Sequence, residues 1–501
     1  MLSIILKKKY QEVKNLKGHT SYEILLDSNF TYNFGNLHFF LFKLFYIIVY
    51  YKMSKRYLSI ASSNGGAGTF GYSAGNPQLK FLVSNNGLLQ SQELRFQGTF
   101  KRVLNTLAGG ATLNEVDATK DLNVDAFCGI QSVIQNLEIS SRQYSNRSIE
   151  TISNYPRLVS NFMSGLHSKS GLDTQVYHEQ GAKGYGFDTL NEESHTDATN
   201  ATSSYQSVDQ KLAMKIPYCA VKGIEFDMRL VCGMFMSQDI DLEALGGLAI
   251  TINLAPNESV LYGTDASLYH YIIENPRLVV PVLSKTEQQQ IALAENPSPQ
   301  MNFLSFTSLY NTINSTDQQV VHRVSLKGVI STMSNFIPTS YINSYTQNGQ
   351  AQYNPAIQKL VYNMDGKRFP LEYSIEVDRD ESLSELNQPS TNPQLLRNYI
   401  EAFRNSKDVK KSCINPVISG TQSQMDKHGV FGIGASFDSV SNAGIPAEIS
   451  TLGFELQCKL TDPTTFGSLP NAQTTLTYSV YTYYLCRNSV QVGAGGLQVV
   501  N

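Results

Sequence analysis

Two overlapping glycine motifs in the segment 66–75 have the spacing of known chemical sites. Gly66-Ala67-Gly68-Thr69-Phe70-Gly71 fits GxGxxG, the phosphate-binding turn of dinucleotide sites, and Gly71-Tyr72-Ser73-Ala74-Gly75 fits GxSxG, which exposes a serine nucleophile. The first motif needs an apolar strand before it and a helix that begins on it, and the second needs a strand-to-helix turn. Asn76-Pro77 follows at once, and proline steers the residue before it away from helix. We therefore expect neither site, and a hydrolase that uses Ser73 is the weakest alternative.

Polar residues elsewhere could hold a metal ion or a nucleic acid. His178-Glu179 and His195 lie in one acidic, polar stretch, but their spacing matches no ligand motif. The run Asp378, Asp380 and Glu381 lacks the glycine and the final glutamate of a calcium loop. Lysines at 407, 410 and 411 form only a small basic patch. We therefore expect no catalytic, cofactor-binding or metal-binding residues, no cofactor and no specific nucleic-acid binding. The acidic neighbours of the two histidines are Asp188, Glu192, Glu193 and Asp197.

The composition is typical of a β-rich, non-catalytic protein. The chain has 501 residues, enough for two or three domains, and only 16% of them are charged. A formal net charge of -3 provides no basic field that would attract nucleic acid. The six cysteines are scattered without a close pair, which favours reduced, buried thiols over disulfides.

The first 76 residues differ from the rest of the chain. Residues 1–52 are rich in Phe, Ile, Lys, Asn and Tyr, which AT-rich codons encode, and Met53 resembles a translation start. The apolar run from Phe39 to Tyr51 is short for a membrane span and is interrupted by Lys43, so it would be a signal-anchor or interfacial segment if it were real. We predict that residues 1–52 are a non-structural extension, with no stable membrane span in the mature protein. Residues 53–76 are predicted to be a flexible Gly/Ser-rich arm.

A strand pattern occurs twice in the chain. Residues 247–254 and 453–460 have apolar side chains at the same alternate positions, and each begins with a glycine, Gly247 or Gly453. Each copy follows another alternating segment, 224–230 or 430–437, and precedes a Tyr-rich strand, 269–280 or 478–492. This repeat is too long for a solenoid and indicates two homologous β-domains.

Most of the remaining pattern also predicts strands. Glu93–Lys101 and Leu371–Asp378 alternate polar and apolar residues, as half-buried antiparallel strands do. Helical periodicity is predicted only at Asp125–Asn136, Ser284–Glu295 and Asn392–Asn405.

Two long polar stretches, Ser164–Gln210 and Asp378–Ser412, fall at comparable places in the two halves. Loops of this length usually carry function or an interface. We predict an all-β fold of two tandem jelly-roll barrels, with a first domain at 77–283, a connector at 284–300 and a second domain at 301–501.

Several motifs also resemble a known family. Asn76-Pro77-Gln78-Leu79-Lys80-Phe81-Leu82, the segment Leu94–Phe100, the segment Ser334–Tyr345 and Gly366–Tyr373 resemble major capsid proteins of polinton-like viruses and virophages. The Asn76-Pro77-Gln78 start is similar to that of capsid proteins of larger nucleocytoplasmic DNA viruses. The resemblance covers the chain by pattern from Pro77 to Val492, and residues 1–52 depart from it.

This resemblance implies a double jelly-roll subunit that forms trimeric, pseudohexameric capsomers of an icosahedral shell. The implied partners are two further copies of the chain, neighbouring capsomers, and penton and minor capsid proteins; the implied location is the virion, assembled inside the host cell. The polar stretches 164–210 and 378–412 would then form intratrimer and outer-surface loops. A tandem β-sandwich binding or adhesion module is the alternative, but the absence of Trp and of a disulfide framework disfavours it.

Overall fold

The structure is a computed structural model that describes part of the chain. All described residues belong to a unit that begins at Ser54. The predicted extension 1–52, nearly all of both predicted loops and residues 286–299 of the predicted connector lie outside them. The described residues are 55–64, 68–105, 123–124, 128–144, 148–166, 224–237, 239–262, 265–285, 300–315, 317–322, 328–345, 349–350, 355, 357–369, 375–376, 402, 432–437, 451–458, 477–493 and 496–500.

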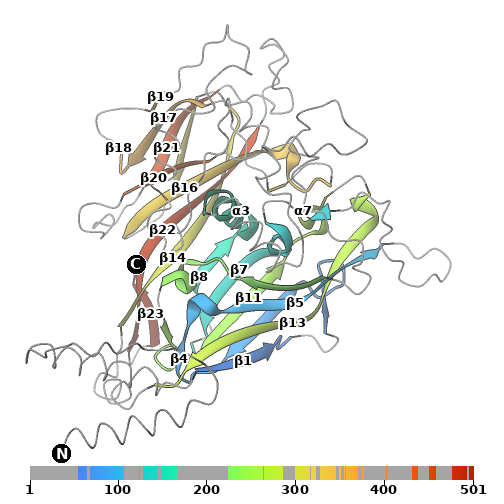
Figure 1. The fold of residues 1–501 in the computed structure, drawn as a ribbon. Helices are drawn as coiled ribbons and strands as arrows, with labels where there is room; N and C mark the ends of the chain where they lie inside the picture. The colour runs from blue at the N-terminus through green and yellow to red at the C-terminus, as the bar shows by residue number, and fades with distance from the viewer. Residues whose placement is uncertain are drawn as a thin grey trace, which may run out of the picture. The chain divides into compact units, whose positions relative to one another are not determined.

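The first half of the described chain forms two main antiparallel sheets, which we call the first barrel (Figure 1). One sheet has the order β10-β4-β13-β5-β9, with β1 and β2 also paired to β13; the other has the order β3-β11-β7-β8. Two short strands, β6 and β12, pair separately. The strands are β1 (Lys55–Ala61), β2 (Thr69–Phe70), β3 (Gln78–Val83), β4 (Leu88–Leu89), β5 (Arg95–Leu104), β6 (Asn123–Val124), β7 (Ile134–Ser141), β8 (Ser148–Ser153), β9 (Ile224–Arg229), β10 (Ile240–Asp241), β11 (Leu248–Leu254), β12 (Leu261–Tyr262) and β13 (Tyr269–Leu283).

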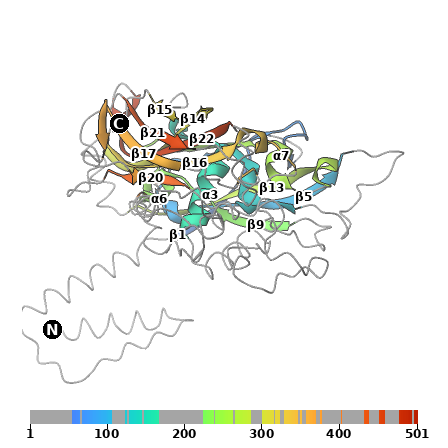
Figure 2. The same cartoon turned by 90° about the horizontal axis from the view of Figure 1, so that it is seen from above.

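The second half forms another pair of antiparallel sheets, the second barrel, in which β16 and β22 run side by side (Figure 2). One sheet has the order β14-β22-β16-β20, with β23 added to β22; the other has the order β15-β21-β17-β18, with β19 added to β17. The strands are β14 (Gln300–Ile313), β15 (Asp317–His322), β16 (Val329–Pro338), β17 (Ile357–Met364), β18 (Lys367–Phe369), β19 (Ile375–Glu376), β20 (Ile433–Ser436), β21 (Leu452–Cys458), β22 (Tyr478–Gly493) and β23 (Gly496–Val500).

The two barrels have the same strand order. The path β1-β13-β5-β9 in the first barrel corresponds to β14-β22-β16-β20 in the second, and β3-β11-β7-β8 corresponds to β15-β21-β17-β18. In the first barrel the first strand, β1, pairs with the last, β13; in the second barrel β14 pairs with β22, after which β23 extends the same sheet. The strands of each barrel are divided between its two sheets in the order of a jelly roll. The predicted fold class, two tandem jelly-roll barrels, is confirmed. The predicted repeat falls on equivalent strands, with β11 and β21 in its two copies.

Alternating apolar residues build each core. On β11, Ile250 and Ile252 are fully buried, and the neighbouring β3 contributes Phe81. The ring of Phe81 packs edge-on against Phe96 at a centroid distance of 5.9 Å, and Phe336 and Phe454 pack similarly at 6.5 Å in the second barrel. Each fully buried apolar side chain contributes about 1.5–3 kcal/mol, so these faces set the strand register.

Two sequence predictions are wrong in the described part of the chain. The segment predicted as a flexible arm contains β1 and β2, because the jelly roll needs a first strand to pair with β13. The predicted helix Asp125–Asn136 is instead a 3₁₀ turn at Gly129–Val133 followed by β7, whose register is fixed by its pairing with β11.

The other predicted elements have mixed outcomes. The strand expected at Glu93–Lys101 is β5, and only β19 is described within Leu371–Asp378. The other two predicted helices, Ser284–Glu295 and Asn392–Asn405, lie almost wholly outside the described residues. Only residues 284, 285 and 402 of these segments are described, and Ala402 is helical. Elsewhere within the described residues the α-helices are α3 (Tyr155–Leu166), α6 (Gly233–Ser237) and α7 (Asn257–Val260). No helix within the described residues is long and apolar enough to cross a membrane. The domain boundaries stay predictions.

Candidate functional site: the junction between the barrels

A buried carboxylate joins the two barrels. Glu150 lies on β8 of the first barrel and is 3% exposed. Its Oε1 accepts the backbone N–H of Phe306 on β14 at 2.7 Å and that of Gly233 on α6 at 2.9 Å, while Oε2 accepts the N–H of Met234 at 2.8 Å. Each such hydrogen bond contributes about 0.5–1.5 kcal/mol when the carboxyl is neutral and about 1.5–3 kcal/mol when it is ionised. One side chain therefore ties β8 to α6 within its own barrel and to β14 in the other.

The burial of Glu150 follows from its place on β8. Glu150 lies opposite the fully buried Ile139 of β7, so the two side chains share the inner face of the sheet. The register shifts between this pair and Ser140–Ser148, which leaves Ile149 as an extra residue in β8. Glu150 is thus buried at an irregular place in the strand, where α6 and β14 supply its hydrogen-bond donors. Burial raises the pKa of the Glu150 carboxyl to about 7, and the three backbone N–H groups limit the rise.

Gly233 permits the close approach of α6 to β14. A Cβ atom at this position would lie 2.6 Å from the Cα of Ser305 and 2.7 Å from the carbonyl oxygen of Leu304. These are backbone atoms of the second barrel, so they cannot move aside as the end of a flexible side chain could. A glycine is therefore required where the two barrels meet, directly beside Glu150.

A second group of contacts surrounds the turn between β8 and α3. The backbone N–H of Ser153 donates to the Ser308 hydroxyl at 2.9 Å, and the hydroxyl of Tyr483 donates to the carbonyl oxygen of Asn154 at 2.8 Å. The Arg157 guanidinium lies 5.2 Å from the ring centroid of Tyr481 in a cation–π arrangement. These contacts bind the start of α3 to β14 and β22.

The segment Ser334–Tyr345, which carried the sequence resemblance, forms part of this junction. All ten residues of β16, which contains its first part, are buried. The Asn335 amide donates to the carbonyl oxygen of Arg157 at 3.2 Å, and Asn343 accepts a hydrogen bond of 3.0 Å from Ser259. A cavity of about 40 Å³ lies here, with room for a few water molecules. Its lining includes Gln135, Asn154, Arg157, Asn343, Gln350 and Tyr481.

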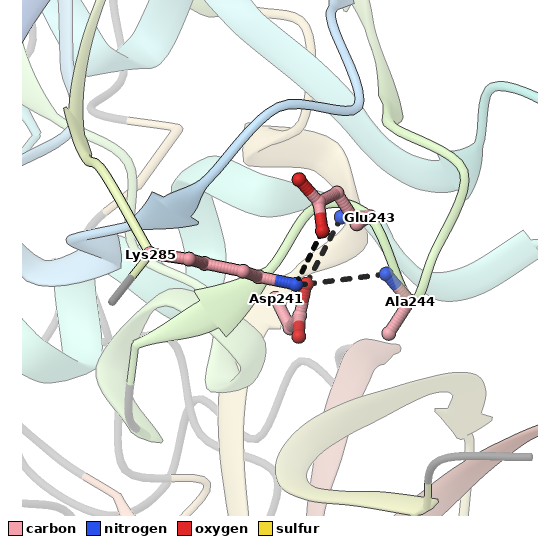
Figure 3. Close-up of polar contacts among 4 residues, drawn as sticks. All are labelled: Asp241, Glu243, Ala244 and Lys285. Atoms are coloured by element: carbon pink, nitrogen blue, oxygen red, sulfur yellow. Dashed lines mark hydrogen bonds and ion pairs between the residues drawn. The ribbon is translucent and has the colours of Figure 1, made fainter. Parts of the chain in front are cut away.

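A partly buried ion cluster around Lys285 fixes the chain where it leaves the first barrel (Figure 3). The Lys285 ammonium lies 2.7 Å from Asp241 Oδ1 and 2.8 Å from Glu243 Oε2, and its side chain is only 2% exposed. The same Asp241 oxygen accepts the backbone N–H groups of Glu243 and Ala244, at 3.0 and 3.2 Å. Lys285 follows β13 directly, so this cluster anchors the beginning of the predicted connector to the turn after β10.

The glycine motifs do not form the elements that their chemistry needs. Residues 72–75 form a turn between Gly71 and Asn76, which are bridged as in an antiparallel pair, so Ser73 does not lie on a strand-to-helix turn. Its hydroxyl accepts a hydrogen bond of 2.6 Å from the Asn257 amide. Of the GxGxxG segment, Gly68 to Gly71 are described; they include β2 and no helix.

The other polar residues singled out in the sequence are not described by the structure. His178, Glu179 and His195 with their acidic neighbours, Asp378, Asp380 and Glu381, and the lysines at 407, 410 and 411 all lie outside the described residues. Within the part of the chain that is described, no group of three or more His, Cys, Asp and Glu side chains could hold a metal ion. The sequence motifs did not indicate Glu150, since its surroundings come from strands far away in the chain.

Comparisons with solved structures find the same fold, although no family model and no curated protein sequence matches the chain. A chain of the Sputnik virophage matches with a TM-score of 0.51 and 10% identity, over 97% of this chain and 91% of that one. The Faustovirus major capsid protein matches with a TM-score of 0.50 and 8% identity, over 98% of both chains. The resemblance suggested by the sequence is thus confirmed at the level of the fold. The chain has a double jelly-roll fold like that of the Faustovirus major capsid protein.

Proposed function

We propose that the chain is a viral major capsid protein. Its main support is that both barrels have the same strand order and that the fold matches the Faustovirus major capsid protein over 98% of both chains. The buried junction around Glu150 adds a physical reason, because a shell subunit must transmit load between its barrels without hinge motion. Backbone and side-chain hydrogen bonds across the junction, and glycine-mediated backbone contact at Gly233, favour a rigid block.

The proposed assembly is a homotrimer. Two barrels of like topology in each subunit would give a trimer six similar sides, so that the capsomers could tile an icosahedral shell with near-hexagonal packing. The proposed partners are neighbouring capsomers, penton proteins and minor capsid proteins, and the proposed location is the virion. Residues 164–210 and 378–412 are the proposed contact and outer-surface loops.

The proposed role is structural rather than catalytic. Ser73 lies in a turn and its hydroxyl accepts a hydrogen bond from the Asn257 amide, whereas a serine nucleophile needs a neighbouring base. The carboxyl of Glu150 accepts backbone N–H groups and is 3% exposed, which suits a structural tie.

Size-exclusion chromatography with light scattering tests this proposal. We expect a particle with about three times the 55.6 kDa chain mass, or slightly less if residues 1–52 are absent from the product. Negative-stain electron microscopy of the same fraction should show hexagonal particles. A stable, well-folded monomer at micromolar concentration would contradict the trimer and weaken the capsid assignment.

A further inference from the structure

We propose that Glu150 makes the junction between the two barrels proton-sensitive: protonation of its carboxyl keeps β8 closed on β14, and ionisation favours an opened junction that admits water. The inference concerns a single chain and goes beyond the capsid role. It starts from the position of the carboxyl, which is 3% exposed and bonded to backbone groups of both barrels.

The protonated carboxyl fits the closed junction. Oε1 is the atom that accepts from both Phe306 and Gly233, and a carbonyl oxygen has two lone pairs for these two N–H donors. The proton can then reside on Oε2, which as a hydroxyl oxygen still accepts the Met234 N–H, and the Cys232 thiol is a further hydrogen-bond partner of the carboxyl. The neutral form thus retains both hydrogen bonds that Oε1 accepts, including the one from Phe306 in the second barrel.

The ionised carboxylate is less well accommodated. Moving a carboxylate from water into a protein interior costs several kcal/mol, and hydrogen bonds recover only part of that cost. Among the described residues, the groups that donate hydrogen bonds to it are uncharged: α6 contributes the N–H groups of Gly233 and Met234, and β14 contributes that of Phe306. The titratable neighbour is Cys232, whose pKa burial raises well above its ordinary value, so that it stays a neutral thiol. Opening the junction would let water solvate the charge.

The direction of the pH effect follows from linkage. The pKa of Glu150 is raised from 4.5 to about 7 in the closed structure, so the closed state holds the proton more tightly than a state in which the carboxyl is hydrated. The stabilisation is complete below pH 4.5 and is lost as the pH rises to about 7. Because one proton is involved, the equilibrium constant for opening rises by up to about tenfold per pH unit in this range.

Amide hydrogen exchange of the full chain, followed by mass spectrometry, tests this inference. Protection factors are measured between pH 5 and 8 and corrected for the intrinsic pH dependence of exchange. We expect peptides that contain Phe306 or Met234 to lose protection by up to about tenfold per pH unit until pH 7, and then to level off. Peptides from β11 serve as an internal reference and should keep their protection, because the opening is local. Equal loss in β11 would indicate global unfolding and would overturn the proposal.

Two variants separate the role of Glu150 from other titrations. Glu150→Gln is a neutral side chain of the same shape, and it should remove the pH dependence at Phe306. Glu225→Gln removes a carboxylate from an exposed position on β9 of the same barrel and should behave like the wild type. If Glu150→Gln retains the wild-type pH dependence, a different group is responsible and the proposal is overturned.

A measurement on the wild type alone covers the case in which Glu150→Gln does not fold. Infrared difference spectra over the same pH range should contain the carbonyl band of a protonated carboxylic acid that disappears as Phe306 loses protection. The absence of any carboxylic acid that titrates near pH 7 would overturn the proposal, whatever the behaviour of the variants. A negative result in the exchange or the infrared experiment would not affect the trimer expected for a capsid protein, because the trimer is measured independently.

Discussion

The side-chain hydroxyl of Tyr483, in the second barrel, donates a hydrogen bond of 2.8 Å to the backbone carbonyl oxygen of Asn154, in the first. Asn154 has a φ of 53°, in the left-handed region that asparagine tolerates better than most residues, and it connects β8 to α3. Its carbonyl oxygen also accepts the backbone N–H of Arg157 at 2.9 Å. A side chain of one barrel thus supports an uncommon backbone conformation in the other.

Tyr483→Phe should lower the free energy of unfolding by about 1 kcal/mol, because it removes the hydroxyl and leaves the ring in place. The loss is moderate since the Asn154 carbonyl oxygen keeps its bond from Arg157. Urea denaturation followed by circular dichroism measures it. Tyr310→Phe is the matched control: the Tyr310 side chain is 50% exposed and its hydroxyl bonds to Ser479 at 3.1 Å, so we expect a change within about 0.5 kcal/mol. Equal effects of the two changes would argue against a special role for the bond to Asn154.

Gly453→Ala should destabilise the second barrel by at least about 3 kcal/mol, because there is no space for a methyl group. An ideal Cβ would lie 1.9 Å from the carbonyl oxygen of Val320 on the paired strand β15. An ideal Cβ on Gly247, its counterpart in the sequence repeat, would lie 2.6 Å from the carbonyl oxygen of Val83. Thermal unfolding provides the measurement, with Gly349→Ala as control, since the nearest atom to a Cβ there is 3.9 Å away. A Gly453→Ala protein that melts like the control would refute the close packing of β15 on β21.

Lys285→Met should cost about 2 kcal/mol, because it leaves Asp241 and Glu243 without the cation between them while retaining most of the apolar stem. The carboxylates are 28% and 36% exposed, and hydration limits the loss. The control is Lys55→Met, which breaks a more exposed pair with Glu93 and should cost no more than about 1 kcal/mol. Denaturant midpoints at low and high salt measure both effects. If Lys285→Met is no worse than Lys55→Met, the Lys285 cluster has no special role in anchoring the chain.

The described cysteines should resist thiol reagents in the native protein. Cys128, Cys232, Cys458 and Cys486 are buried, reduced thiols. Burial raises the pKa of Cys486 from 9.0 to about 12, which lowers the reactive thiolate fraction by roughly a thousandfold. Maleimide labelling with peptide mapping should therefore modify these four positions only after denaturation, with the denatured protein as the reference. Rapid labelling of Cys486 in the native state would contradict its burial.

The strands of the repeat could be predicted from the sequence because apolar and polar residues alternate along a half-buried strand. The segment 247–254 could therefore be matched to 453–460, and the structure places both on equivalent strands. The 3₁₀ turn at Gly129–Val133 was mistaken for part of a helix, because its apolar residues are followed directly by β7 and together mimic helical spacing. Only the pairing of β7 with β11, more than a hundred residues later, decides the matter.

The junction could not be predicted from local pattern. Glu150 stands in a short segment of mixed polarity, where a carboxylate normally faces water. It is buried because β14, α6 and the residues before α6 cover that face, and their positions depend on the packing of one complete barrel on another. The motif Ser334–Tyr345 did point to this region, but through its resemblance to a family and not through any contact that its residues implied.

Each barrel pairs its first strand with a strand near the end of its half of the sequence, and this has a consequence for synthesis of the chain. Lys55 pairs with Leu283, and Gln300 pairs with Gln491. The sheet that contains each of these pairs can therefore form completely only after the last part of that half of the chain has emerged from the ribosome. Pairing between residues so distant in sequence is intrinsically slow. Until then the apolar faces of β3, β5 and β7 are uncovered, and a nascent chain is exposed to aggregation or to pairing with a neighbouring copy. Expression yield should therefore depend strongly on translation rate and chaperone supply.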